Sequence, residues 1–185
     1  MITFNICFIR QSNHVLLLNR EFPSWMGCWN GIGGKLERDE SPRDSMVREI
    51  MEETELAESD YRLQYKGLVT WTSDHQQFGG MYLYEAQVPE DYVYSTPKKT
   101  SEGILDWKSI EWIMHPENQG LAANLSTVMK YLNDASPYHH HCSYIEGKLA
   151  GILSEVIDEK TEDRERMREY AGIYAENMGI LKINA

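Results

Sequence analysis

Between Gly34 and Leu56, acidic residues recur at spacings that would gather them on one side of a helix. At 100° per residue, Glu49, Glu52 and Glu53 lie within about a 100° arc, one turn apart. Carboxylates this close repel, and each like-charge pair destabilises a helix by roughly 0.2–0.5 kcal/mol. A hard divalent cation would neutralise them. Ligands that are all oxygen favour Mg²⁺ or Mn²⁺, which share their coordination with substrate phosphates. The spacing therefore predicts metal-assisted phosphate chemistry.

A glycine-rich turn precedes this acidic segment. Acidic runs on an amphipathic helix are usually a solvated face, and that alternative would suffice for three glutamates alone. The pair Gly33-Gly34, however, leaves backbone groups free to approach a phosphate or a metal, and it comes directly before the acidic helix. The combination favours a catalytic interpretation over a solvated face.

The helix that would carry the glutamates has a clear start. Ser41 suits the N-cap, Pro42 suits the first helical position, and Asp44 falls in the first turn. Apolar residues then recur at helical spacing as far as Met51. The pattern predicts a helix over about 42–54.

Strand-like patterns surround this helix. Residues 2–8 alternate between apolar and polar, which predicts a half-buried strand, and Val15–Leu18 indicates a second, more buried one. Residues 89–103 look like a long loop. The other expected elements are strands at about 66–73, 80–88 and 104–107, a hairpin at 138–145 and 148–156, and helices at about 121–132 and 162–177. This order predicts an α/β or α+β fold with a mixed sheet.

Composition limits the partners that the chain can have. Its 29 acidic and 18 basic residues give a formal net charge of −11. Nucleic-acid polymers and anionic membranes attract positive surfaces, so we expect neither as a partner. Three widely spaced cysteines without a CxxC pair suit a reducing compartment. No signal peptide or membrane span is evident, and we expect a cytoplasmic protein.

The segment from Gly34 to Leu56 resembles the signature of the Nudix hydrolase family. That signature is a glycine, five residues, Glu, seven residues, Arg-Glu, an aliphatic residue, one residue, Glu-Glu, one residue, a glycine and an aliphatic residue. Every position matches except the second glycine, which is Glu55 here, and the motif covers 23 of 185 residues. The resemblance implies an α/β/α sandwich with a mixed sheet. The family glycine commonly ends the helix in a left-handed conformation, so Glu55 is expected to cost about 1–2 kcal/mol of stability.

The resemblance also implies an activity: metal-dependent hydrolysis of a nucleoside diphosphate linked to another group, by attack of water on phosphorus. Mg²⁺, with Mn²⁺ as a substitute, would be the cofactor. A further acid before Trp107 would be a ligand or base, and Glu102 is the natural candidate, with Asp106 a weaker one. The implied catalytic and metal-binding residues are Glu49, Glu52, Glu53, Arg48 and Glu102, with the Gly33 carbonyl completing the metal shell and Gly34 and Glu40 as structural positions of the signature.

A narrower resemblance concerns the substrate. The segment Trp29–Lys35 is similar to the Trp-Asn-Gly-Phe-Gly-Gly-Lys segment of MutT-type enzymes, which clear oxidised purine nucleoside triphosphates. Asn30 would then read a purine edge, although it could equally be a turn residue before Gly31. Met114–Asn118 resembles the base-pocket segment of the same subgroup, or is an ordinary loop. The implied substrate-binding residues are Asn30, Lys35, Glu117, Asn118 and Asn124.

The expected substrate is therefore a nucleoside triphosphate, with 8-oxo-dGTP or a related purine in view, cleaved to the monophosphate and pyrophosphate. The proline that marks ADP-ribose hydrolases is missing, since Trp71 and Thr72 occupy its place. The tyrosine of diadenosine-polyphosphate hydrolases is absent too. Hydrolysis of ADP-ribose or a dinucleoside polyphosphate is the alternative activity, and a non-catalytic nucleotide sensor is the alternative role.

A C-terminal extension over residues 136–185 would follow a catalytic domain of residues 1–135. It carries no catalytic signature, and could cover the substrate cleft, form a homodimer contact or only cap the fold. Its run His139-His140-His141 looks like a metal cluster, but on a strand only His139 and His141 share a face, and no third ligand is evident. We interpret the run as part of a polar hairpin.

Overall fold

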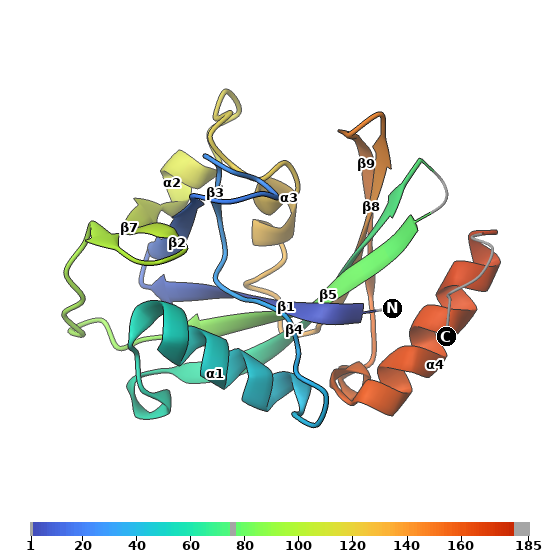
Figure 1. The fold of residues 1–185 in the computed structure, drawn as a ribbon, viewed down its shortest axis with the longest axis horizontal. Coiled ribbons are helices and arrows are strands. Elements are labelled where there is room, and N and C mark those ends of the chain that lie inside the picture. The colour runs from blue at the N-terminus through green and yellow to red at the C-terminus, as the bar shows by residue number, and fades with distance from the viewer. Residues whose placement is uncertain (1, 75–76, 180–185) are drawn as a thin grey trace.

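The computed structural model describes residues 2–74 and 77–179, and within them one mixed sheet of nine strands forms the centre of the molecule (Figure 1). Its order is β6-β7-β2-β1-β5-β4-β8-β9, with β3 paired to β2 beside this path. The pairs β1–β5 and β4–β8 are parallel. The strands are β1 Ile2–Gln11, β2 His14–Arg20, β3 Trp29–Asn30, β4 Arg62–Ser73, β5 Gln77–Gln87, β6 Lys98–Lys99, β7 Gly103–Ser109, β8 Tyr138–Ile145 and β9 Lys148–Val156. The helices are α1 Pro42–Thr54, α2 Ile110–Ile113, α3 Leu125–Met129 and α4 Arg164–Asn177, with 3-10 turns at Glu58–Asp60 and Glu159–Glu162.

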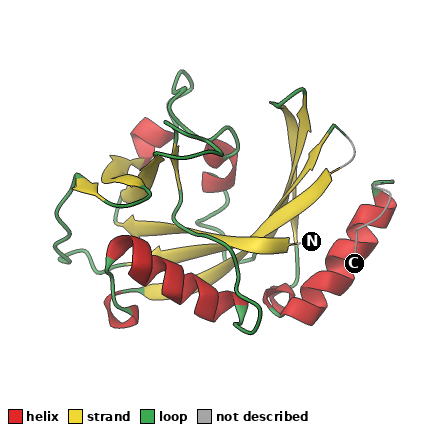
Figure 2. Ribbon diagram, in the orientation of Figure 1, coloured by secondary structure: helices red, strands yellow, loops and turns green. Residues whose placement is uncertain are grey.

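Helices cover both faces of the sheet (Figure 2). Met46 of α1 and Met167 of α4 belong to one core cluster, whereas Ile113 of α2 and Leu125 of α3 belong to another. In the part of the chain that the structure describes, no helix has both the length and the hydropathy needed to cross a membrane. The arrangement is the α/β/α sandwich with a mixed sheet that the resemblance to the Nudix family implies.

The central strand β1 is buried on both sides. Phe8 packs in one core cluster and Ile9 in the other. The expectation of a half-buried strand is therefore wrong, because the helix layers enclose both faces. Asn5, on the side expected to face solvent, is 3% exposed. Its amide donates to Ser45 Oγ at 2.9 Å and accepts from Gly34 N at 3.0 Å, which satisfies a polar group inside the core.

Helix α1 begins and ends where the sequence predicts. Asp44 N donates to Ser41 Oγ at 3.0 Å, and Pro42 occupies the first turn. Glu55 follows the last turn with φ 68° and ψ 13°. A glutamate thus adopts the left-handed conformation that the family usually gives to glycine, and its carboxylate lies 2.8 Å from Lys98 Nζ.

The helix expected over residues 121–132 is much shorter in the structure, where α3 spans only Leu125–Met129. Trp29 N donates to Gly120 O at 2.8 Å, and Ala122 N donates to Trp29 O at 3.0 Å. The chain around residue 121 is therefore extended and paired with Trp29. The loop expected over 89–103 also contains a short strand, β6, which pairs with β7.

The C-terminal hairpin is part of the same sheet. β8 runs parallel to β4, pairing residues 67–73 with residues 138–144, and β9 pairs antiparallel with β8. At the tip of the hairpin, Asp74 N donates to Tyr144 O at 3.0 Å, and Glu146 N donates to Asp74 Oδ1 at 2.9 Å. The hairpin thereby widens the sheet beyond β4.

The three consecutive histidines are buried, each at 1–2% exposure, so the interpretation of a polar hairpin is wrong for them. Thr70 Oγ1 lies 2.6 Å from His139 Nε2 and 2.8 Å from His141 Nδ1. Ser154 Oγ lies 2.8 Å from His140 Nδ1. Because neighbouring hydroxyl groups satisfy the imidazoles, these polar side chains can lie in the core.

Candidate active site

Arg48 is the centre of a charge network on α1. Its Nη2 lies 2.8 Å from Glu40 Oε1 and its Nε lies 3.1 Å from Glu40 Oε2. Its Nη1 donates to Glu49 Oε1 at 2.8 Å and to Glu52 Oε2 at 3.0 Å. The guanidinium lowers the pKa of Glu40 to about 2. Arg48 therefore ties the loop that carries Glu40 to the helix.

Glu53 has a different environment. Its Oε1 accepts a hydrogen bond from Gly33 N at 3.2 Å, whereas Oε2 is buried without a hydrogen-bond partner among the described residues. Burial, aided by the charges of Glu49 and Glu102, raises the pKa of Glu53 to about 8 against the hydrogen bond from Gly33. A buried carboxylate oxygen without a partner is a natural ligand for a divalent cation.

The donor set fits a hard divalent cation. It consists of oxygen atoms alone, and its carboxylates repel one another. In the conformation described, Arg48 engages Glu49 and Glu52, and across residues 2–74 and 77–179 no three acidic, histidine or cysteine side chains form a metal-binding group. The chain thus supplies the ligand chemistry of a metal site, while two of the three glutamates are bound to the guanidinium.

The glycines of the turn permit a close approach between the loop, the sheet and α1. At Gly33, which has φ 150°, a Cβ atom would lie 2.3 Å from Asn5 O. At Gly34, a Cβ atom would lie 2.5 Å from both carboxylate oxygens of Glu49. No larger residue fits at Gly34 while Glu49 keeps this position.

The two acids considered outside the signature differ in position. Glu102 precedes β7 and lies near enough to Glu53 to raise its pKa. Asp106 lies within β7 and pairs with Lys108 Nζ at 2.7 Å. The geometry therefore favours Glu102 over Asp106 as a partner of the glutamate helix.

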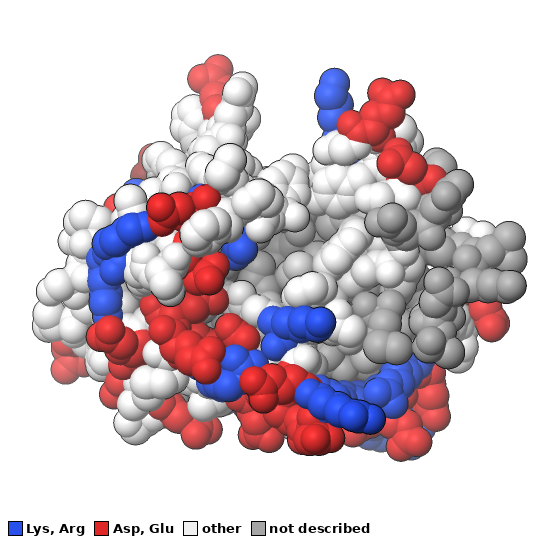
Figure 3. All heavy atoms as spheres, viewed as in Figure 1, with Lys and Arg blue, Asp and Glu red and all other residues white. Residues whose placement is uncertain are grey.

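A cavity of about 500 Å³ begins at the glycine turn and extends over the face of the sheet. This volume is suited to a small-molecule ligand. Figure 3 shows acidic side chains gathered over α1, below a hollow in the middle of this face. The aromatic and apolar part of the cavity wall includes Phe4, Trp25, Trp71, Met81 and Tyr144.

Two of the predicted substrate-binding residues, Asn30 and Asn124, line this cavity. Asn30 Oδ1 accepts a hydrogen bond from Gly31 N at 2.9 Å, which is the geometry of a turn residue. Its position on the cavity wall is the one that a base-reading residue would need. Both interpretations of Asn30 therefore have a structural basis.

The other three predicted substrate-binding residues lie outside the cavity. Lys35 is exposed on the loop before α1, and Glu117 is exposed on the loop after α2. Asn118 uses its amide within that second loop, where Nδ2 donates to Trp112 O at 2.8 Å. The structure does not bring this group together with Asn30 and Asn124.

Sequence reasoning missed a cation and a set of hairpin residues in the cavity. Arg20, at the end of β2, lines it, and its charge acts on Glu53. A basic residue two positions after the apolar run Val15–Leu18 was the available signal. The hairpin residues Cys142, Tyr144 and Gly147 also line the cavity, and no local pattern could have indicated this, because it depends on the pairing of β8 with β4.

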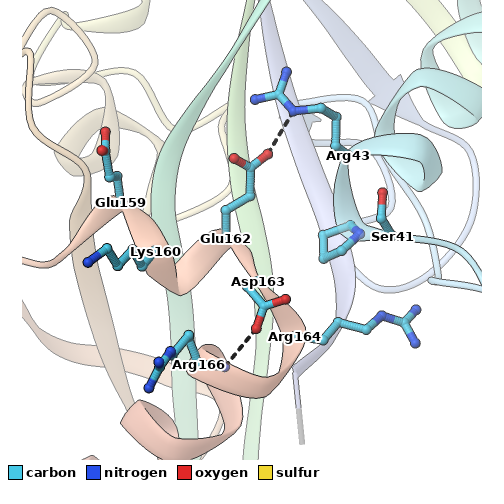
Figure 4. A pocket seen from close by; sticks show the side chains of 9 residues that line it. Ser41, Arg43, Glu159, Lys160, Glu162, Asp163, Arg164 and Arg166 are labelled. Carbon is cyan, nitrogen blue, oxygen red and sulfur yellow. Dashed lines mark hydrogen bonds and ion pairs between the residues drawn. The ribbon is translucent and has the colours of Figure 1, made fainter.

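A second cavity, of about 710 Å³, lies between the starts of α1 and α4 (Figure 4). Its charged residues are largely occupied by contacts with one another or with the backbone. Arg43 Nε donates to Glu162 Oε1 at 2.9 Å, and Arg164 donates to the carbonyl groups of Glu37 and Arg38 at 2.8 and 2.9 Å. These contacts join α4 to the loop before α1 and α1 to the turn before α4, so we assign this cavity a structural role.

Comparison with known proteins agrees with the fold and the signature. The family model of the NUDIX domain matches residues 1–130. The chain therefore belongs to the Nudix hydrolase family. An uncharacterized Nudix hydrolase of Bacillus subtilis (strain 168), YvcI, is 30% identical over 110 residues, which are 59% of this chain and 66% of that protein's length.

Solved structures show the same fold. A MutT protein from Bacillus halodurans superposes with a TM-score of 0.67 at 22% identity, over 82% of this chain and 96% of that chain. A MutT NUDIX hydrolase from Burkholderia pseudomallei gives 0.55 at 20% identity, over 71% and 98%. The NUDIX domain of Shewanella oneidensis NrtR, complexed with ADP ribose, gives 0.52 at 18% identity, over 70% and 82%. At these identities the likeness establishes the fold alone.

Proposed function

We propose that the protein is a divalent-metal-dependent pyrophosphohydrolase of a nucleoside triphosphate, with Mg²⁺ as the cation and an oxidised purine such as 8-oxo-dGTP as a substrate. Water adds across the anhydride between the α- and β-phosphates, and the products are the nucleoside monophosphate and pyrophosphate. The observation that carries the proposal is a junction: an apolar cavity of nucleoside size meets the acidic helix at Gly33 and Gly34.

The two ends of the substrate would meet different chemistry in this junction. Aromatic and apolar side chains of the cavity suit a base, with the amides of Asn30 and Asn124 available for polar contacts at its edge. Arg20 carries positive charge toward Glu53, where the phosphates would lie. The substrate would therefore point its phosphates at α1.

The acidic residues and Arg48 would then divide the work of the site. Glu49, Glu52 and Glu53, with the Gly33 carbonyl, would hold the cation, which supplies charge neutralisation and activation of water when bound. Glu102 would serve as a further ligand or as the base. Arg48 orients Glu49 and Glu52 through the contacts described, and Glu40 fixes Arg48.

A substrate panel tests the proposal. The purified protein is incubated with canonical and 8-oxo nucleoside triphosphates, ADP-ribose and dinucleoside polyphosphates, with Mg²⁺ or with a chelator, and released phosphate and pyrophosphate are measured. We expect pyrophosphate from triphosphates and no turnover after chelation. If the protein hydrolyses ADP-ribose or a dinucleoside polyphosphate faster than the triphosphates, that compound replaces the nucleoside triphosphate as the assigned substrate. Binding without any turnover would identify a nucleotide sensor and overturn the assignment as an enzyme.

A further inference from the structure

We propose that the C-terminal hairpin completes the substrate cavity, and that Tyr144 on β8 is a specificity-determining residue that contacts an aromatic nucleobase. The proposal rests on the proposed function for the identity of the phosphate end of the ligand. It adds a role for residues beyond 130, where the match to the family domain ends.

The C-terminal hairpin closes one side of the cavity. The strands β1, β4 and β5 form its floor, and β8 lies next to β4 on the side away from β5. Cys142, Tyr144 and Gly147 line the cavity from this side. Figure 1 shows the hairpin beside the ends of β4 and β5. Without β8, the cavity would be open along the whole edge of β4.

The wall that β8 forms is held in place by contacts on two sides. Backbone pairing with β4 runs along β8 from Tyr138 to Tyr144, and Asp74 binds the backbone of Tyr144 and Glu146 at the tip. On the opposite face of β8, His139 and His141 pack against the ring of Tyr174 in α4. The wall is therefore held by the sheet on one side and by a helix beneath it.

The wall brings aromatic rings together at the cavity. The rings of Tyr144 and Trp25 meet with their centroids 6.3 Å apart at an angle of 55°, although they come from distant segments. Rings already in contact leave no room for a base between them, so the base would lie beside them, near Trp71. Among the described residues that line the cavity there is no carboxylate. A flat, uncharged aromatic group is the ligand that such a wall accepts.

The test separates the base from the rest of the nucleotide. We compare GMP, AMP, CMP and ribose 5-phosphate, which lacks a base, by calorimetric titration of the full-length protein. The ratio of the dissociation constants for ribose 5-phosphate and GMP measures the contribution of the base. Tyr144→Ala should reduce this ratio about tenfold, since the base loses the aromatic ring on which it stacks. Tyr144→Phe keeps the ring and should retain the ratio.

Tyr138→Ala is the matched control. Tyr138 lies on the same face of β8, but its ring packs on Tyr131 and it does not line the cavity. We expect the wild-type ratio in this variant. In turnover assays, Tyr144→Ala should raise KM for the triphosphate more than it lowers kcat.

An unchanged ratio in a folded Tyr144→Ala protein would overturn the proposal, and so would equal binding of GMP and ribose 5-phosphate by the wild type. If Tyr144→Ala does not fold, a normal ratio in Tyr144→Phe together with a reduced ratio in Tyr144→Leu supports the proposal, and a normal ratio in both overturns it. Absence of hydrolysis in the wild type would refute the proposed function alone, because the binding comparison needs no turnover.

Discussion

Arg48 offsets part of the repulsion on the acidic helix before any cation binds. It contacts Glu40, Glu49 and Glu52 at once, so the repulsion expected among the glutamates is relieved for two of them. Glu53 pairs with no cation among the residues that the structure describes, and its pKa is raised to about 8, chiefly by burial. Burial also raises the pKa of Glu49, against the contact with Arg48, so the penalty falls on these two carboxylates.

We predict that Glu53→Gln separates activity from folding. The amide keeps the size of the side chain but removes a charge from the site, so turnover with saturating Mg²⁺ should fall at least about a hundredfold, as loss of several kcal/mol of metal-assisted stabilisation implies. The urea midpoint of the metal-free protein should stay or rise, because folding no longer has to bury and protonate a carboxyl group whose pKa it raises to about 8. Glu58→Gln, at an exposed position, is the control. Near-wild-type turnover in Glu53→Gln would exclude the proposed role.

A second prediction concerns Asn30. If its amide reads a purine edge, Asn30→Ala should reduce the ratio of kcat/KM for 8-oxo-dGTP and dGTP by roughly tenfold or more, since a lost hydrogen bond in a built site costs about 1–3 kcal/mol. Kinetics with both substrates measure this ratio. An unchanged ratio with a lower melting temperature would show that Asn30 only stabilises the turn, through its hydrogen bond with Gly31 N, and does not contact the base.

At the scale of the secondary-structure elements, the end of α1 carries a measurable strain. A left-handed residue other than glycine costs about 1–2 kcal/mol, and Lys98 offsets little of it, because an exposed ion pair contributes about 0–1 kcal/mol. We predict that Glu55→Gly raises the free energy of unfolding by about 0.5–1 kcal/mol. Urea denaturation at constant m-value measures it, with Lys98→Ala reporting the ion pair. A lower midpoint in Glu55→Gly would show that the contact with Lys98 outweighs the strain.

Elements with local signals could be predicted from the sequence, and those that depend on distant pairing could not. The capping residues of α1 and the alternation of the hairpin lie within the segments that they define, and both elements have the expected bounds. The shortening of α3 depends on Trp29, about 90 residues away. The candidate site divides in the same way. The glutamates of α1 follow from their spacing, whereas Tyr144 reaches the cavity only through the pairing of β8 with β4.

At the scale of the whole molecule, a chain of hydrogen bonds joins the sheet to α4. Tyr170 Oη donates to Glu155 Oε1 at 2.7 Å, so it accepts from His139 Nδ1, 2.8 Å away. His139 Nε2 then accepts from Thr70 Oγ1, which in turn accepts from His141 Nδ1. The other nitrogen of His141, Nε2, lies 3.2 Å from Thr72 Oγ1 and accepts from it. In this order both imidazoles are neutral, because each has one nitrogen that accepts. Glu155 therefore faces a neutral histidine across 3.8 Å, and not an ion pair.

These hydrogen bonds to a neutral, buried His139 predict that the protein loses stability in acid. Burial lowers the pKa of His139 to about 3, so the unfolded chain takes up a proton near pH 6.5 that the folded chain refuses. Stability is thus complete above pH 6.5 and falls as the pH falls toward 3, by roughly 2 kcal/mol for this group between pH 7 and 5. Urea denaturation at several pH values should show a smaller decrease in His139→Gln, while His115→Gln, on an exposed loop, keeps the wild-type decrease. The same decrease in all three proteins would contradict the assignment.

The parallel pairing of β4 with β8 has a consequence for the newly made chain. Gly67 and its partner Tyr138 are 71 residues apart in sequence, and at about 5–20 residues per second a ribosome needs roughly 4–14 s to cover that distance. During this interval β4 has β5 on one side and an unpaired edge on the other. The hairpin does not yet cover Val69 and Trp71, which are residues of β4. Such an edge can pair with another chain. The nascent protein is therefore most open to aggregation, or to capture by a chaperone, in the seconds before its hairpin emerges.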